Sequence, residues 1–196
     1  RRPPCDRVAE FCRENHIAMK GHPLFWHEFV PSWLPKNWNE LLPLIEKRFR
    51  EISERYADII PVFDCINEPS RLFDQIFESR KNDWNYVFPP AGYVEQIFAL
   101  AEKYFKNNTL ILNEATGASF CDYRGRYGGN YLLLEKLINK GIKIDRIGLQ
   151  CHCFDSEYYK NIFNSERLYR LLDGYATLKK PLVISEISIS QEDEEI

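Results

Sequence analysis

Residues 62–69 read VFDCINEP, a short apolar run that ends in a carboxylate and a proline. A second run of the same kind, PLVISE, occupies residues 181–186 and also ends in a glutamate. Neither run alternates strictly between apolar and polar residues, which is typical of strands buried on both faces of a parallel sheet. Both runs therefore predict parallel strands, with Glu68 and Glu186 at the strand ends where the loops of a β/α barrel carry functional residues.

Strands and helices are expected to alternate along the whole chain. Five runs rich in Val, Ile, Leu or Phe are strand candidates: residues 18–26, 61–66, 109–112, 146–151 and 182–187. Apolar residues recur at helical spacing in four stretches between or before them: residues 5–15, 38–56, 93–105 and 131–139. Asn37 is the expected N-cap of the second helix, and Gly141 is expected to stop the last. This alternation predicts the α/β class and a TIM (β/α)8 barrel.

Only five β/α units are visible, whereas a closed barrel of this kind has eight. Two strands are missing in front of residue 18 and one behind residue 187, and an open sheet would leave two bare edge strands. We therefore expect residues 1–196 to be one catalytic domain that lacks the first two strands and the last, and we expect the missing strands to be supplied by flanking sequence of a longer protein.

Composition excludes several functional classes. The chain has 196 residues, is 44% hydrophobic and carries a net charge of −3 with scattered Lys and Arg, so we expect no nucleic-acid partner. No run is long enough to cross a bilayer, and the first residues are not followed by the apolar segment of a signal peptide. We expect a globular protein with no membrane partner, whose export signal, if any, lies outside these residues.

Six cysteines are spread through the chain, and we expect them to be free, mostly buried thiols. The triplet Cys151-His152-Cys153 could suggest a metal site. On a strand, however, successive side chains point to opposite faces, so His152 is expected to face away from both thiols. No metal and no cofactor is therefore expected.

Four segments, in this order, resemble glycoside hydrolase family 10, the endo-β-1,4-xylanases. They are GHPLFWH (21–27) followed by PSW (31–33), FDCINE (63–68), IGLQCH (147–152) and VISEI (183–187). The resemblance spans nearly the whole chain, from the family's third strand to its seventh. More broadly, Asn67-Glu68-Pro69 and a lone Glu186 at later strand ends are typical of retaining β/α-barrel glycosidases.

The resemblance implies a role for each matching residue. Glu68 is similar to the family's general acid/base and Glu186 to its nucleophile. The matching substrate-binding residues are His22, Trp26, Asn67, Gln150 and His152. Retaining hydrolysis needs this carboxylate pair, one to protonate the leaving oxygen and one to attack the anomeric carbon. An ionised Glu186 nearby would also help to keep Glu68 protonated. His27 points opposite to Trp26 by strand alternation, so we expect it outside the site.

Three positions depart from the family pattern. Phe29 stands where a polar residue, often Gln, is usual, so one sugar subsite is expected to differ. Ser188 replaces an acid two residues after the nucleophile, and we expect His152 to be held less firmly. Asn113-Glu114 replaces an Asn-Asp pair. The family's second-strand Lys and Asn and eighth-strand Trp have no counterpart in these residues.

Together these features predict a retaining endo-β-1,4-xylanase that hydrolyses internal xylosidic bonds by double displacement. Two alternatives stay open: a non-catalytic carbohydrate-binding relative or truncated pseudoenzyme, and a barrel glycosidase acting on another β-1,4-glycan. We expect a monomer with a polysaccharide substrate, xylan or xylo-oligosaccharides. The resemblance implies a secreted or cell-surface location, because a polymer does not readily enter a cell.

Overall fold

The computed structural model describes residues 2–70, 85–120, 128–153 and 164–189. The helices are α1 (Arg2–Glu14), α2 (Trp38–Tyr56), α4 (Tyr93–Tyr104), α5 (Thr116–Ser119), α6 (Gly129–Asn139) and α8 (Ser165–Ala176). The strands are β1 (Lys20–Gly21), β2 (Phe25–Trp26), β3 (Val62–Asn67), β4 (Thr109–Glu114), β5 (Arg146–Cys153) and β6 (Leu182–Ile189). None of the helices within these ranges is long and apolar enough to cross a membrane.

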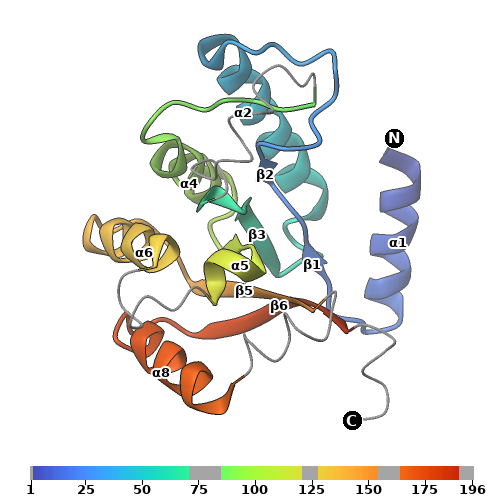
Figure 1. Ribbon diagram of the computed structural model, residues 1–196. Helices are drawn as coiled ribbons and strands as arrows, with labels where there is room; N and C mark the ends of the chain where they lie inside the picture. Colours follow the sequence, from blue (N-terminus) through green and yellow to red (C-terminus); the bar gives the residue numbers. More distant parts are fainter. Residues whose placement is uncertain (1, 71–84, 121–127, 154–163, 190–196) are drawn as a thin grey trace.

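The strands form one parallel sheet in the order β1-β3-β4-β5-β6, and β2 also pairs with β3. The sheet curls, and α2, α4, α6 and α8 follow one another around its outer side (Figure 1). A parallel sheet curled inside a ring of helices is part of a β/α barrel, which confirms the predicted fold class.

Several predicted elements are confirmed almost to the residue. Helix α2 begins and ends where expected, and its N-cap Asn37 accepts a hydrogen bond from the backbone of Asn39 at 2.9 Å. Helix α6 ends at Asn139, and Gly141 has a φ of +76°, a conformation that glycine adopts without strain.

Other expectations need correction. The strand expected over residues 18–26 is two short strands, β1 and β2, because Pro23 between them has no N–H to donate to a ladder. Strands β4, β5 and β6 all extend two residues beyond their predicted ends. Helix α8, with its side-chain N-cap Asn164, and the single turn of α5 were not predicted.

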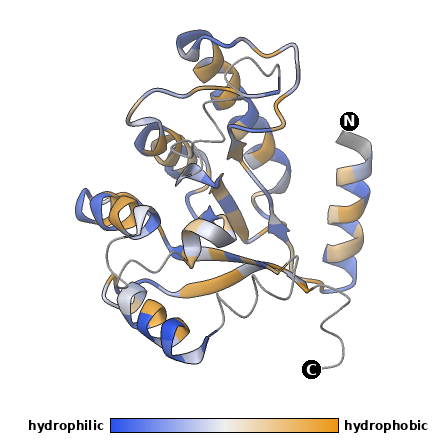
Figure 2. Cartoon of the chain, in the orientation of Figure 1, coloured by the Kyte–Doolittle hydropathy of each residue, from blue (hydrophilic) through white to orange (hydrophobic). Residues whose placement is uncertain are grey.

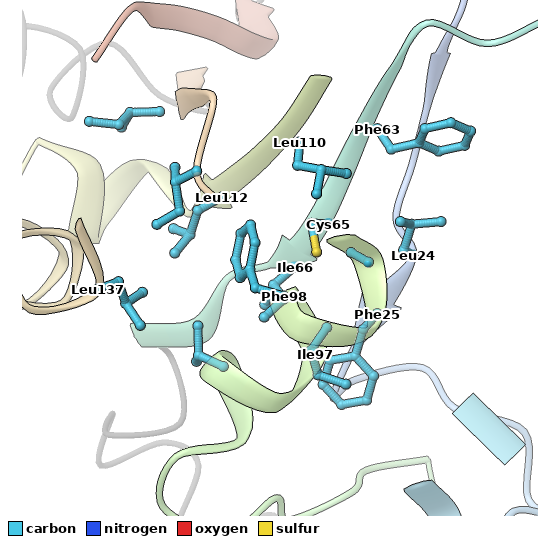
Figure 3. Close-up of a cluster of buried hydrophobic side chains, with 14 of the residues drawn as sticks. Leu24, Phe25, Phe63, Cys65, Ile66, Ile97, Phe98, Leu110, Leu112 and Leu137 are labelled. Atoms are coloured by element: carbon cyan, nitrogen blue, oxygen red, sulfur yellow. The ribbon is translucent and has the colours of Figure 1, made fainter. Parts of the chain in front are cut away.

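The main hydrophobic core lies between the sheet and the surrounding helices. Leu110 and Leu112 of β4 and Ile66 of β3 are fully buried there, near Ile97 and Phe98 of α4 (Figure 3). Hydrophobic residues concentrate on the strands and on parts of the helices, whose remaining residues are hydrophilic (Figure 2). This packing holds the strands in place, so the side chains at their carboxyl ends have fixed positions.

Apolar side chains are also exposed on the first helix and the last strand. Among the described residues, Val8 and Phe11 of α1 and Ile184, Ile187 and Ile189 of β6 are each more than half exposed. Within the described part of the chain, strand β6 pairs with β5 alone. Edges and apolar faces of this kind are normally covered in folded proteins.

Candidate active site

Glu68 lies directly after β3 and is almost completely buried. Its φ of +53° is unusual for a residue with a side chain, and its N–H donates to the carbonyl oxygen of Asn113 at 2.7 Å. Such left-handed backbone costs of the order of 1–3 kcal/mol and is concentrated at functional sites.

Glu186 lies within β6, which continues to Ile189, so the strand ends later than the sequence predicted. Its Oε1 accepts a hydrogen bond from Asn113 Nδ2 at 2.7 Å, and its Oε2 lies 3.2 Å from His152 Nε2. The register between β5 and β6 shifts so that Ser185 is an extra residue in β6, a β-bulge just before the glutamate. Bulges of this kind redirect side chains and are common beside active sites.

Asn113, on β4, joins the two glutamate-bearing strands. Its Nδ2 donates to Asn67 Oδ1 and to Glu186 Oε1, both at 2.7 Å, and its Oδ1 accepts a hydrogen bond from Ser185 Oγ. Gln150 Nε2 also donates to Asn67 Oδ1, at 3.2 Å. The network therefore links Glu186 to the residue next to Glu68. Sequence reasoning did not assign Asn113 to the site, although it had noted the Asn113-Glu114 pair.

His152 is held on both ring nitrogens. Its Nε2 faces Glu186, and its Nδ1 lies 2.9 Å from Ser188 Oγ. Because an ionised carboxylate can only accept, Nε2 must carry a proton, and in a neutral ring Nδ1 then accepts from the Ser188 hydroxyl. Ser188 therefore orients His152 through a hydrogen bond of its own. Whether this hydroxyl holds the ring less firmly than an acid would stays a prediction.

His22 belongs to a second charged cluster beside Glu186. Its Nδ1 lies 2.8 Å from Asp64 Oδ2 and 3.7 Å from Glu186 Oε1. The three side chains offer ligand atoms within 4.8 Å of one another, so they are the candidate metal ligands among the described residues. Lys20 Nζ, however, already forms an ion pair with the fully buried Asp64 carboxylate. The positive charge of Lys20 therefore compensates Asp64 without a metal ion.

Trp26 is in register with Asn67, which places it beside the network just described. Its ring contacts that of Phe29 at a centroid distance of 4.9 Å, and both line an apolar groove of about 690 Å³ with Trp33. Phe29 has a φ of +54° and is 66% exposed. Exposed aromatic faces in a groove suit the packing of sugar rings. His27 is fully buried and lies 3.5 Å from Glu28, outside this group as expected.

The thiols also deviate from expectation at one end of the chain. Cys65, Cys151 and Cys153 are free and buried, but Cys5 is exposed and Cys12 is partly exposed, while Cys121 lies outside the described residues. Burial raises the pKa of Cys151 to about 11. The side chains of Cys151 and Cys153 lie in the core and His152 faces Glu186, so the alternation predicted for this triplet is confirmed.

Glu114 is a buried acid that sequence reasoning left outside the site. It ends β4 and is fully buried, and burial raises its pKa from an ordinary 4.5 to about 7. Hydrogen bonds from Ser70 and Ala115 oppose this rise, and the nearby charge of Glu68 adds to it. A buried carboxyl next to a candidate catalytic acid is a functional candidate itself.

The curled parallel sheet, with polar residues gathered at the carboxyl ends of its strands, places the chain in the class of β/α-barrel proteins. A model of glycosyl hydrolase family 10 matches residues 3–196. The chain belongs to glycosyl hydrolase family 10.

Two similar proteins are named as endo-1,4-beta-xylanases. Endo-1,4-beta-xylanase A of Caldicellulosiruptor saccharolyticus is 28% identical over 192 residues, which cover 94% of this chain and 53% of the relative. Endo-1,4-beta-xylanase B of Thermotoga neapolitana is 26% identical over 187 residues, which cover 94% of this chain and 51% of that relative. The chain therefore spans about half the length of these relatives.

Solved structures share the fold over nearly all of this chain. A thermostable mutant of the xylanase Xyn10A from Cellvibrio japonicus superposes with a TM-score of 0.73 at 19% identity, covering 99% of this chain and 58% of that one. A mutant protein in complex with xylotriose has a TM-score of 0.73 at 22% identity, covering 100% and 59%.

Proposed function

We propose that the protein containing this chain is a retaining endo-β-1,4-xylanase and that these residues are the central part of its single catalytic domain. The supporting observation is the Asn113 amide, which bonds Glu186 and also bonds Asn67, the residue before Glu68. The named relatives are endo-1,4-beta-xylanases, and one structural neighbour is a xylotriose complex.

The proposed reaction has two displacements at the anomeric carbon. In the first, a Glu186 oxygen forms a bond to that carbon, the glycosidic C–O bond breaks, and Glu68 gives its proton to the leaving oxygen. In the second, Glu68 takes a proton from water, the water oxygen attacks the anomeric carbon, and the Glu186 ester bond breaks. Both glutamates then return to their starting protonation states.

The neighbouring side chains have supporting roles in this proposal. His152 and Asn113 fix the two oxygens of Glu186 and so hold one rotamer for attack. His22, Trp26, Asn67 and Gln150 bind the sugar next to the cleaved bond. Xylan is the proposed substrate, a monomer is the proposed active form, and a secreted or cell-surface location follows from the size of such a polymer.

The first test uses the full-length protein with xylan, cellulose and mannan, and scores the oligosaccharides released. We expect products from xylan, and with Glu68→Gln or Glu186→Gln we expect activity to fall by at least about 10³-fold with the fold intact. Glu102→Gln, on an exposed helical position, is the matched control. No product from any of the three polymers would favour the carbohydrate-binding alternative, and product only from cellulose or mannan would change the substrate.

The second test identifies the nucleophile. Glu186→Gly lacks the attacking carboxylate, so added azide should restore turnover of an activated aryl xyloside and give a glycosyl azide of inverted configuration. A product of retained configuration, or wild-type turnover without azide, would remove Glu186 from this role.

A further inference from the structure

Glu114 places a carboxylate where the fold would otherwise have an apolar side chain. By strand alternation it shares a face of β4 with Leu110 and Leu112, which belong to the hydrophobic core. Two backbone N–H groups donate to its carboxylate: Ser70 N to Oε2 at 3.0 Å and Ala115 N to Oε1 at 2.9 Å. Burying an ionisable group in such a place is unfavourable, so a function other than packing is indicated.

The bond to Ser70 fixes the backbone that carries Glu68. On one side of the segment, the N–H of Glu68 itself bonds the Asn113 carbonyl at 2.7 Å. On the other side, the N–H of Ser70 bonds Glu114. Pro69 between them has no N–H and cannot contribute a bond of its own. Adjacent residues of β4 therefore hold the segment at both ends.

Glu68 needs this support because of its backbone. A φ of +53° in a residue with a side chain persists only where the surroundings impose it. If the Ser70 bond is lost, the segment after Glu68 can relax toward ordinary dihedral angles. The carboxyl group of Glu68 would then change its height and direction at the end of β3.

We propose that Glu114 is a positioning residue, which holds Glu68 in the orientation required to protonate the leaving oxygen. This inference rests on the acid/base role proposed above for Glu68. Glu114 acts through the backbone of residues 68–70 and does not touch the substrate.

Among the described residues, two other titratable groups interact electrostatically with Glu114. Glu68 faces it from the end of β3, and Tyr93 faces it from α4. Burial raises the pKa of Tyr93 well above its ordinary value of 10, and the negative charge of Glu114 contributes, so Tyr93 stays neutral. The carboxyl group of Glu68 is therefore the acidic neighbour whose position Glu114 affects.

Substitutions at position 114 separate positioning from general damage. Gln has one acceptor oxygen, so in Glu114→Gln one of the two N–H donors faces an amide NH2. Glu114→Asp keeps both acceptors on a side chain shorter by one methylene and should have a milder effect. Glu102→Gln is the control, because Glu102 is an exposed glutamate of α4.

The experiment compares two substrates with the full-length protein. Xylan has a leaving group that must be protonated, whereas 2,4-dinitrophenyl β-xylobioside has one that departs without a proton. For Glu114→Gln we expect kcat/KM to fall by roughly 30- to 100-fold on xylan, in the range found for misplaced catalytic groups. On the dinitrophenyl substrate we expect a change of less than about 3-fold, because kcat/KM reports only the first displacement.

Rescue by azide is a second, independent test of whether Glu114 positions Glu68. Glu68 acts as base for water in the second displacement, and azide needs no base. Azide should therefore raise kcat of Glu114→Gln on the dinitrophenyl substrate and leave the wild type and Glu102→Gln unchanged.

The outcomes are distinct. Equal losses on both substrates, or no loss on xylan, would overturn the positioning role of Glu114. If Glu114→Gln does not fold, Glu114→Asp is compared on the same two substrates. Its kcat/KM should also fall more on xylan than on the dinitrophenyl substrate. A wild type inactive on both substrates would instead overturn the proposed function.

Discussion

Glu114→Gln should change how the stability of the protein depends on pH. Burial raises the pKa of Glu114 from 4.5 to about 7 in the folded chain, whereas the unfolded chain has the ordinary value. The folded state therefore binds the proton more tightly. The stabilisation that comes from protonating Glu114 in the folded state is fully present below pH 4.5 and is lost as the pH rises through 7.

The size of this loss follows from the two pKa values. A difference of about 2.5 between them corresponds to about 3 to 4 kcal/mol over the full titration, at about 1.4 kcal/mol for each pH unit, and about 3 kcal/mol of it is lost between pH 4.5 and pH 8. Glutamine does not ionise, so the stability of Glu114→Gln does not fall in this way as the pH rises. The free energy of unfolding of the wild type minus that of Glu114→Gln should thus fall by about 3 kcal/mol between pH 4.5 and pH 8.

Urea unfolding followed by tryptophan fluorescence at pH 4.5, 6, 7 and 8 measures this difference. Taking the difference between two proteins removes the contributions of all other titrating groups that do not contact position 114. The exposed control Glu102→Gln should give a difference that is flat with pH. The free energy of unfolding of the wild type minus that of Glu114→Gln could instead change by less than about 1 kcal/mol over this pH range, or rise with pH. Either result would contradict a raised pKa for the buried Glu114 carboxyl.

Substitutions at three further positions test the network around Glu186. In Gly148→Ala the new Cβ would lie 2.8 Å from Asn113 Oδ1, so we expect a loss of about 1–3 kcal/mol in urea unfolding, and a loss below about 0.5 kcal/mol would show that the site has room. Asn113→Ala removes the amide that binds Glu186 Oε1, and kcat on xylan should fall at least about 10-fold. Because Asn113 is fully buried and bonds Asn67 as well, stability should fall too, so kcat is measured well below the melting temperature; an unaltered kcat would exclude a role in turnover. Ser188→Ala removes the hydroxyl that orients His152, so kcat should fall several-fold, whereas Ser188→Thr keeps the hydroxyl and should retain activity. Equal rates in the two Ser188 variants would show that His152 is held by other contacts.

The fold could be predicted from sequence because its signals are local. Helix α2 was placed from its apolar spacing and its cap Asn37, and the parallel strands from their uninterrupted apolar runs. The missed helix α8 also had such signals, since Asn164 caps it and Leu171 and Tyr175 are buried four residues apart. The local sequence of α8 therefore contains the same kinds of helix signal as that of α2.

The candidate site was predictable only in part. Glu68, Asn67, Gln150 and His152 were assigned through family motifs, and the structure brings the last three into one hydrogen-bond network with Glu186. The contribution of Asn113 depends on a pairing between strands that no local pattern contains. Sequence therefore indicates which residues end a strand, but not which of them meet across the sheet.

The two β-bulges explain why these side chains meet. Asp64 pairs with Ile111 but Ile66 pairs with Leu112, so Cys65 is an extra residue in β3. Without it, continued pairing would place Asn67 opposite Glu114, on the core-facing side of β4. With it, Asn67 pairs with Asn113 and the two amides share a face.

The bulge at Ser185 has the same effect on the last strand. Leu149 pairs with Ile184, and regular pairing would then place Glu186 opposite Cys151, whose side chain lies in the core. The extra residue places Glu186 opposite Gln150 instead, on the face that also presents His152. Because a slip of one residue reverses every side chain, both bulges are needed to bring Asn67, Asn113 and Glu186 together. The network at this end of the sheet is therefore a product of strand register as much as of residue identity.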